Sequence, residues 1–453
     1  MSSGVYRSGI VLILMLSFGC ASPLQDQAWR TPRPLGAQVP TYKPPRTPTP
    51  HVKDDVVVEV SHETLTLAQA VSLTLLHHPR LQAAAWDVRI AEARSLQASL
   101  APNPTGGVNV ENFGGTGPLS GLDRSVTTLR IGQLIELAGK REKRTAVAEH
   151  AATLGGWDYE VTRLQVLVET TRRFIEVLAD QHRVELAADT LRLAEEAHRI
   201  VADRVNAGVT PTADRDRSRV HVSQERIALQ RARRVLENSR HQLAASWNSS
   251  EPRFKRVVGD LGQVSEVPTM ATVMPLLQQN PNLARWDDEV AHRQAVIESE
   301  RARGIPDVTV GPGVRYLNDS DEKAFVFEAS MPFPIIDRNQ GNVLAARYAL
   351  AKAYAERRDA QRQVHEALSD AIYKLHASHR EIEILRTQTV SAARSAFEAA
   401  SQAFREGASD YTTVLDTERT YIDVRRQEIE ALAEYQLLVN QTEGLIAQPL
   451  NNR

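Results

Sequence analysis

The most constraining feature of the sequence is a junction at which a strand-like segment turns directly into a very long helix. Residues 324–331 alternate apolar and polar side chains, which is the two-residue period of a strand. Pro332 and Pro334 then exclude both a central strand and a helix interior. An Ala-, Glu-, Arg- and Gln-rich segment with helical character follows over residues 340–405. Residues 125–141 make the same switch earlier, which indicates one duplicated architecture.

The rest of the chain repeats in the same order. The residues HPRL at 78–81 are echoed by NPNL at 280–283, and a second proline follows each at a similar distance. We therefore predict a first repeat over residues 65–248, an inter-repeat loop over 249–268, a second repeat over 269–448 and a tail over 449–453. The predicted strands are 107–113, 125–133, 307–317 and 323–331, and the predicted long helical hairpins are 140–247 and 340–448.

The N-terminus has the pattern of a targeting segment. Arg7 precedes an apolar run that is too short to span a membrane, so residues 1–19 are predicted to be a signal peptide. Cys20, the only cysteine, cannot form an internal disulfide and is placed like the lipidated cysteine of a bacterial lipoprotein. The alternative is ordinary cleavage near Ala21. Residues 20–64 are predicted to form a lipid-anchored, proline-rich arm with little core of its own.

Charge and helix length exclude several classes of protein. The formal net charge is −2, so nothing indicates nucleic acid as a partner. The segment from residue 140 to residue 206 contains no proline, and at about 1.5 Å per residue it could reach roughly 100 Å. No compact domain needs a helix of that length. We expect water-soluble helical hairpins, because their apolar stripes alternate with dense charge.

The four strands have the length and alternation of tilted membrane strands. Open sheet edges are not tolerated in lipid, so several chains must close one barrel, and three chains would give twelve strands with room for a lumen. Phe325 and Phe327 are predicted to face lipid, whereas Arg130 and Arg315 are predicted on the lumen side. The predicted fold class is mainly α with a small membrane β-barrel and an α-barrel of long antiparallel hairpins.

At the two junctions the chain resembles the TolC-like outer membrane factors, and most of all the CzcC and CusC branch that serves heavy-metal efflux. The resemblance is carried by QLIELAGKR at 133–141 and MPFPIIDRNQG at 331–341, and it extends over about residues 65–446. It implies a homotrimer, a twelve-stranded barrel in outer membrane lipid and a periplasmic helical tunnel. It also implies a periplasmic adaptor and an inner-membrane pump of the resistance-nodulation-division (RND) type as partners. The junction residues that it marks are Gln133, Gly139, Lys140, Arg141, Pro332, Pro334, Arg338 and Gly341.

The resemblance also assigns roles to the hairpin tips. The family closes its periplasmic aperture with acidic rings, and Asp416 matches one aperture position of that pattern. Thr413 stands where another acid is found in TolC, and Asp410 could supply an alternative one. The competing interpretation is that these acids are ordinary turn and cap residues. An adaptor is expected to dock near the tips at Gly208 and Gly407.

No sequence motif points to an enzyme or a cofactor. There is no HExxH, GxSxG or cysteine pair, and the residues around Gly139 lack the spacing of a phosphate-binding loop. His365, His376 and His379 share a predicted helix but are more simply explained as surface residues. We therefore expect a passive efflux duct for heavy-metal cations. A drug-efflux or type I secretion duct, or a periplasmic coiled-coil scaffold, remains open at this stage.

Overall fold

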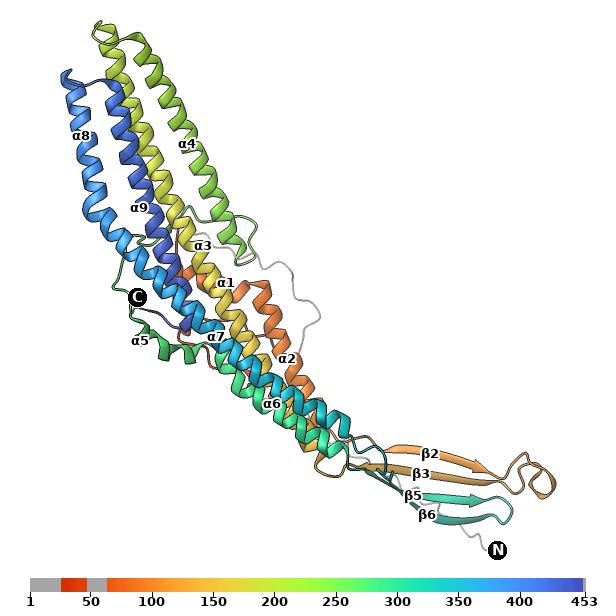
Figure 1. Cartoon of the computed structure of the whole chain (residues 1–453). Coiled ribbons are helices and arrows are strands. Elements are labelled where there is room, and N and C mark those ends of the chain that lie inside the picture. The colour runs from red at the N-terminus through yellow and green to blue at the C-terminus, as the bar shows by residue number, and fades with distance from the viewer. Residues whose placement is uncertain (1–25, 47–62, 451–453) are drawn as a thin grey trace.

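The chain forms an elongated rod with a small sheet at one end and two helical hairpins at the other (Figure 1). The computed structural model describes residues 26–46 and 63–450. The longest helix, α3 (Lys140–Asn206), has 67 residues and therefore extends over about 100 Å. It pairs with α4 (Thr212–Ala245), and α8 (Val390–Glu406) pairs with α9 (Tyr411–Ile446).

The other elements either pack along the middle of the rod or form the sheet at its end (Figure 1). The first half contains the 3₁₀ turn η1 (Asp26–Ala28), β1 (Thr64–Thr66), α1 (Leu67–His77), α2 (Pro79–Ser99), β2 (Thr105–Glu111), the 3₁₀ turn η2 (Gly117–Leu119) and β3 (Val126–Ile135). The second half contains β4 (Arg256–Val258), α5 (Met270–Val273), the 3₁₀ turn η3 (Met274–Gln279), α6 (Pro281–Arg303), β5 (Val308–Leu317), β6 (Glu322–Ser330) and α7 (Gln340–Ile384). Helix α3 packs against α2, α4, α6 and α9, so it is the central element of the body.

The helices start where local chemistry dictates. Thr66 forms a capping box with Gln69 at the start of α1. His78 and Asn280 cap α2 and α6 with their side chains, and each helix begins with proline, whose missing N–H is not needed there. The predicted echo between the HPRL and NPNL segments therefore corresponds to two equivalent helix starts.

The four long strands form one antiparallel sheet in the order β2-β3-β5-β6. One rung places Val108, Leu129, Val314 and Phe325 side by side, and all four side chains are exposed. Glycines and polar residues alternate with these rungs on the other face. The strand ends differ from the predicted ones by at most two residues. Strand β2 ends at Glu111 because Asn112 has a left-handed backbone (φ 59°) that turns the chain.

The second long helix is not continuous, contrary to expectation. A π-helical segment, Leu385–Thr389, separates α7 from α8. Such a segment locally rewinds a helix and changes its direction. Leu385 is buried there, and the Arg386 guanidinium donates to the carbonyl of Gly262 (2.9 Å). Packing against the inter-repeat loop therefore accounts for the interruption.

Residues of the proline-rich arm are more deeply buried than predicted. Ala28 and Leu35 are buried, and the Leu35 N–H donates to the Ala447 carbonyl (3.0 Å). The fully buried Arg163 pairs with Glu160 (3.1 Å) and donates to the Leu35 carbonyl (3.4 Å). The arm therefore packs across α3 and joins the core of the body over residues 26–46, which the prediction of an arm with little core of its own did not anticipate.

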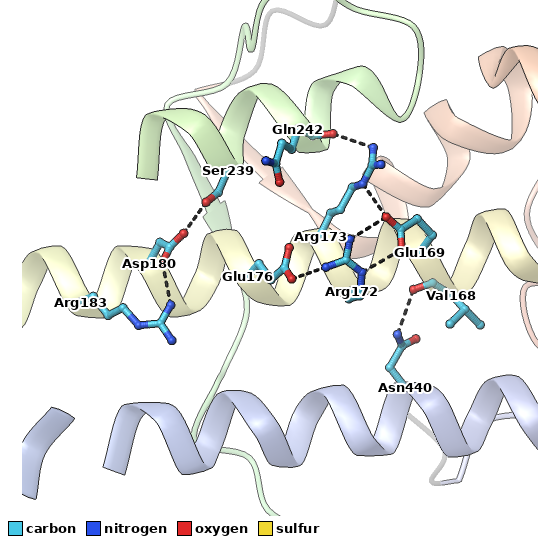
Figure 2. A network of polar contacts seen from close by, with 10 residues as sticks. All are labelled: Val168, Glu169, Arg172, Arg173, Glu176, Asp180, Arg183, Ser239, Gln242 and Asn440. Atoms are coloured by element: carbon cyan, nitrogen blue, oxygen red, sulfur yellow. Dashed lines mark hydrogen bonds and ion pairs between the residues drawn. The ribbon is translucent and has the colours of Figure 1, made fainter. Parts of the chain in front are cut away.

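A polar network ties α3 to elements of both repeats (Figure 2). Arg173 donates to the Gln242 carbonyl of α4 (2.9 Å). On the opposite side, the Asn440 amide of α9 donates to the Val168 carbonyl (2.9 Å). Ion pairs with Arg172 and Arg173 lower the pKa of Glu169, so this carboxylate stays charged. The two halves are thus joined by directional bonds as well as by apolar packing.

Within the described ranges, no helix is both long enough and apolar enough to cross a membrane.

Candidate functional site

At the first strand–helix junction the chain continues from β3 into α3 through a left-handed turn of the backbone. Gly139 is the N-cap of α3 and adopts a left-handed conformation (φ 64°), which costs glycine little. Lys140 forms an ion pair with Asp307 of the second repeat (2.8 Å), and Asp307 also accepts from the Leu137 N–H (2.9 Å). The Gln133 amide donates to the Pro102 carbonyl (3.1 Å). Three of the four residues predicted at this junction, namely Gln133, Gly139 and Lys140, therefore contribute to its geometry.

Arg144, which the sequence reasoning did not select, is the main clamp of this junction. Its guanidinium pairs with Glu136 and donates to the carbonyls of Ala98 (2.9 Å) and Leu100 (3.1 Å). Arg141, the predicted residue, points outward and is exposed. The two arginines lie one helical turn apart on α3. The position of α2 in the folded protein decides that Arg144, and not Arg141, reaches the carbonyls at the C-terminal end of α2.

The second junction uses the same backbone solution with a different residue. Asn339 caps α7 in a left-handed conformation (φ 60°), and its side-chain amide donates to the Glu300 carbonyl at the end of α6 (2.8 Å). Arg338 donates to the Pro334 carbonyl (3.2 Å) and so folds the loop back on itself. Pro332 is exposed, and nothing lies within 4 Å of a side chain added at Gly341. Gly341 is therefore not required sterically.

The two hairpin tips lie side by side at the far end of the rod (Figure 1). Gly208 and Gly407 occupy the turns with left-handed backbones (φ 76° and 85°). Arg204 crosses from one hairpin to the other, donating to the Phe404 carbonyl (2.6 Å) with its guanidinium 4.8 Å from the Phe404 ring centre. The ion pair between Arg405 and Glu196 (2.8 Å) makes a second link between α8 and α3.

The predicted aperture residues cluster at the start of α9. Asp410 is its N-cap and accepts from both the N–H (2.8 Å) and the hydroxyl (2.6 Å) of Thr413. These hydrogen bonds lower the pKa of Asp410, so the cap stays ionised. Asp416 lies on the next turn and is exposed. The contacts of Asp410 and Thr413 are therefore those of a helix cap, as the competing interpretation expects, whereas the Asp416 carboxylate points to solvent.

A buried ion pair that the sequence reasoning missed joins the hairpins just behind the tips. His221 of α4 and Glu418 of α9 are both nearly inaccessible, and their side chains are 3.3 Å apart. The hydrogen bond to Glu418 raises the pKa of His221, with a smaller contribution from Glu225 on its own helix, while Arg419 opposes the shift. Because 197 residues separate the partners, no sequence spacing could have predicted the pair.

No group of three or more His, Cys, Asp or Glu side chains is arranged to hold a metal ion in the part of the chain that the structure describes. His365 and His376 are exposed on α7, and the half-buried His379 lies near the Tyr435 ring (6.3 Å between centroids). Cys20 lies outside the described residues.

Comparison with known proteins identifies the family. The sequence model of the family described as outer membrane efflux protein matches residues 70–249 and 274–446. The cobalt-zinc-cadmium resistance protein CzcC of Cupriavidus metallidurans is 29% identical over 370 residues, which cover 82% of this chain and 87% of that protein. The nickel-cobalt-cadmium resistance protein NccC of Alcaligenes xylosoxydans xylosoxydans is 24% identical over 302 residues, which cover 67% of this chain and 68% of that protein.

The fold agrees with these matches. A solved structure of CusC superposes with a TM-score of 0.70 at 15% sequence identity, covering 90% of this chain and 99% of that one. The family predicted from the two junction motifs is thereby confirmed, as are the mainly helical, duplicated fold class and the prediction of a channel protein without enzymatic activity. The chain belongs to the outer membrane efflux protein family.

Proposed function

We propose that three copies of this chain close one twelve-stranded barrel in the outer membrane and continue below it as a periplasmic helical tube. The observation that supports this most strongly is the four-stranded sheet with one apolar, exposed face. In the described residues its outer strands, β2 and β6, each have one edge without a partner. Such edges cannot remain open in lipid, and pairing β6 of one copy with β2 of the next satisfies both.

The tube would conduct passively. An inner-membrane RND pump would supply the energy, and a periplasmic adaptor would dock at the tips around Gly208 and Gly407, where both helical hairpins present exposed turns. Arg204, which links the two hairpins, would then be part of the structure that the adaptor has to rearrange.

Heavy-metal cations are the substrate class that we propose. The support comes from two relatives whose names state resistance to cobalt, zinc, cadmium or nickel, and one of them aligns over most of this chain. The exposed Asp416 carboxylate, repeated three times around a threefold axis, would attract cations to the periplasmic mouth. Asp410 and Thr413 would hold the helix end that presents it.

We further propose that the chain is attached to the outer membrane through a lipid on Cys20, after removal of residues 1–19. The described part of the arm begins at Asp26, only six positions later, and is held against the body by Arg30, whose guanidinium pairs with Asp288 on α6. A short tether between lipid and body fits a protein that is already held by its barrel.

Outer-membrane fractionation and mass measurement of the unheated protein in mild detergent test the assembly. A trimer in the outer membrane fraction is expected, and a soluble monomer would refute the duct and favour the scaffold.

The substrate is tested by the growth of a deletion strain on cobalt, zinc, cadmium and nickel, complemented with the native chain or with Asp416→Asn. The deletion strain is expected to be sensitive to the metals. The native chain is expected to restore resistance, and the variant is expected to restore it poorly. Sensitivity to drugs alone would instead favour the drug-efflux duct.

A further inference from the structure

The apolar face of strand β6 does not stop where the strand stops. Within the strand, Phe325 and Phe327 are 94% and 71% exposed. Beyond its end at Ser330, the exposed apolar side chains continue through Phe333 and Ile335, which are 76% and 77% exposed. Phe325, Phe327 and Phe333 are all odd-numbered, as the two-residue period of a strand requires, and a turn in which the Ile335 N–H donates to the Phe333 carbonyl ends this period. Met331 and Ile336 complete this apolar segment, residues 331–336.

The first repeat has only a short counterpart of this segment, in which the exposed Leu137 follows the exposed Ile135 at the end of β3. Four residues, 136–139, connect β3 to α3, whereas nine residues, 331–339, connect β6 to α7. Both connections end in the same left-handed cap, at Gly139 and Asn339, so the passage from strand to helix does not itself require the longer path. The additional length in the second repeat consists mainly of apolar residues that no described part of the chain covers.

The span of the apolar series fits the height of a membrane. From Phe325 to Ala329 the strand covers only about 13 Å at roughly 3.3 Å per residue. From Phe325 to Phe333 the same rise gives about 26 Å along the chain, or about 20 Å of height for a strand tilted by about 40°, which covers most of the apolar band of about 25 Å on outer-membrane barrels. Charged residues flank the series, with Lys323 before it and Arg338 after it.

The backbone of the segment also suits the edge of a bilayer. Non-helical backbone near lipid is costly when its polar groups have no partners. Pro332 and Pro334 have no N–H to satisfy, and the Ile335 N–H donates to the Phe333 carbonyl (2.9 Å). The loop, Arg303 and Asp337 line a hollow of about 490 Å³, and the Arg303 guanidinium pairs with Glu300 (2.7 Å).

We propose that residues 331–336 insert into the periplasmic-side leaflet of the outer membrane and complete the lower edge of the lipid-facing band that β6 begins. The partner is therefore a lipid surface, contacted at the boundary between acyl chains and headgroups. The inference rests on the proposed function, because it requires the sheet to lie in that membrane.

Tryptophan variants of the full-length chain in phosphatidylcholine vesicles with brominated acyl chains test the proposal. Phe333→Trp and Ile335→Trp probe the loop. Phe325→Trp probes the strand, and Tyr373→Trp, at a position 74% exposed on α7, is the control in the helical body. Fluorescence relative to the native chain, in brominated and ordinary lipid, isolates the added indole from the five native tryptophans.

We expect bromine to quench the strand probe and both loop probes but not the control, with iodide in the aqueous phase leaving the loop probes unquenched. If the strand probe is quenched while the loop probes respond only to iodide, the loop is in water and the inference fails while the proposed function stands. If the loop probes resist both quenchers, a neighbouring copy covers them, which also overturns the inference. A strand probe that escapes bromine would refute the proposed membrane barrel itself.

Discussion

Two adjacent glycines in α3 make the packing of the N-terminal arm testable. A Cβ atom added at Gly156 would lie 1.9 Å from the carbonyl oxygen of Ala28, whereas van der Waals contact needs roughly 3.5 Å. A Cβ added at Gly155 would meet only the Ala91 Cβ at 3.6 Å, an ordinary contact. Both glycines lie within one uninterrupted helix, so Gly155→Ala is a matched control for Gly156→Ala.

The displacement of the arm would break a defined set of contacts. Arg30 forms an ion pair with Asp288 (2.5 Å), and side chains so accessible contribute about 0.5–1 kcal/mol. The guanidinium groups of Arg30 and Arg33 lie 4.9 and 4.7 Å from the Trp157 ring centre, and each contact contributes about 0.5–1 kcal/mol. Together the three contacts contribute about 1.5–3 kcal/mol, so the free energy that holds the arm should fall by about that amount in Gly156→Ala and not in Gly155→Ala.

Limited trypsin digestion reads this out at the bond after Arg30. Cleavage by the protease follows the population of the opened arm, so a loss of about 1.4 kcal/mol should make cleavage about tenfold faster. Gly155→Ala should be cleaved at the native rate or more slowly. Equal rates for all three proteins would show that the arm does not pack over Gly156, and the buried contacts described for Leu35 would have to be abandoned with it.

Three further predictions follow from the tips and the junctions. The pKa of His221 is raised above its ordinary value of 6.5 by Glu418, so the stabilisation is complete below about pH 6.5 and is lost as the pH rises through the folded-state pKa. His221→Gln should therefore lower the melting temperature more at pH 5.5 than at pH 8.5, and an equal loss at both pH values would contradict the ion pair. Gly139→Ala should cost about 1 kcal/mol in urea unfolding because of its left-handed backbone, whereas Gly341→Ala should be neutral or stabilising. Arg204→Ala removes a link between the hairpins worth about 1–2 kcal/mol, and amide hydrogen exchange at the tips should become roughly tenfold faster; unchanged exchange would show that the tips are held by other contacts.

Local patterns in the sequence predicted the elements well because strands and helices have fixed periods. Alternation located all four strands to within two residues, and the breaker-free segment predicted α3 despite Gly155 and Gly156. The packing of the arm on the body was not predicted, for the opposite reason. It has no periodic pattern, and the burial of Ala28 and Leu35 depends on a surface formed by helices far away in the sequence.

The contacts that join the hairpins could not be predicted from spacing. Arg204 meets Phe404, and His221 meets Glu418, only because the two repeats pack with one particular register of helix against helix. The π-helical segment at Leu385, which shifts the following residues of α8 relative to a regular helix, is a further feature that spacing does not predict. A sequence with two similar halves thus predicts which elements pair but not which side chains meet.

The two junctions show how a duplicated backbone can take on different tasks. Both start the helix with a left-handed cap, Gly139 in one half and Asn339 in the other. The first is short and is bound to the second repeat, because Lys140 pairs with Asp307 across the halves. The second is held from behind by the contact of Asn339 with the end of α6. Its longer loop is therefore free to present apolar side chains outward, as a membrane contact requires. If the first junction fixes the sheet to the helical body, the second can contact lipid without loosening that attachment.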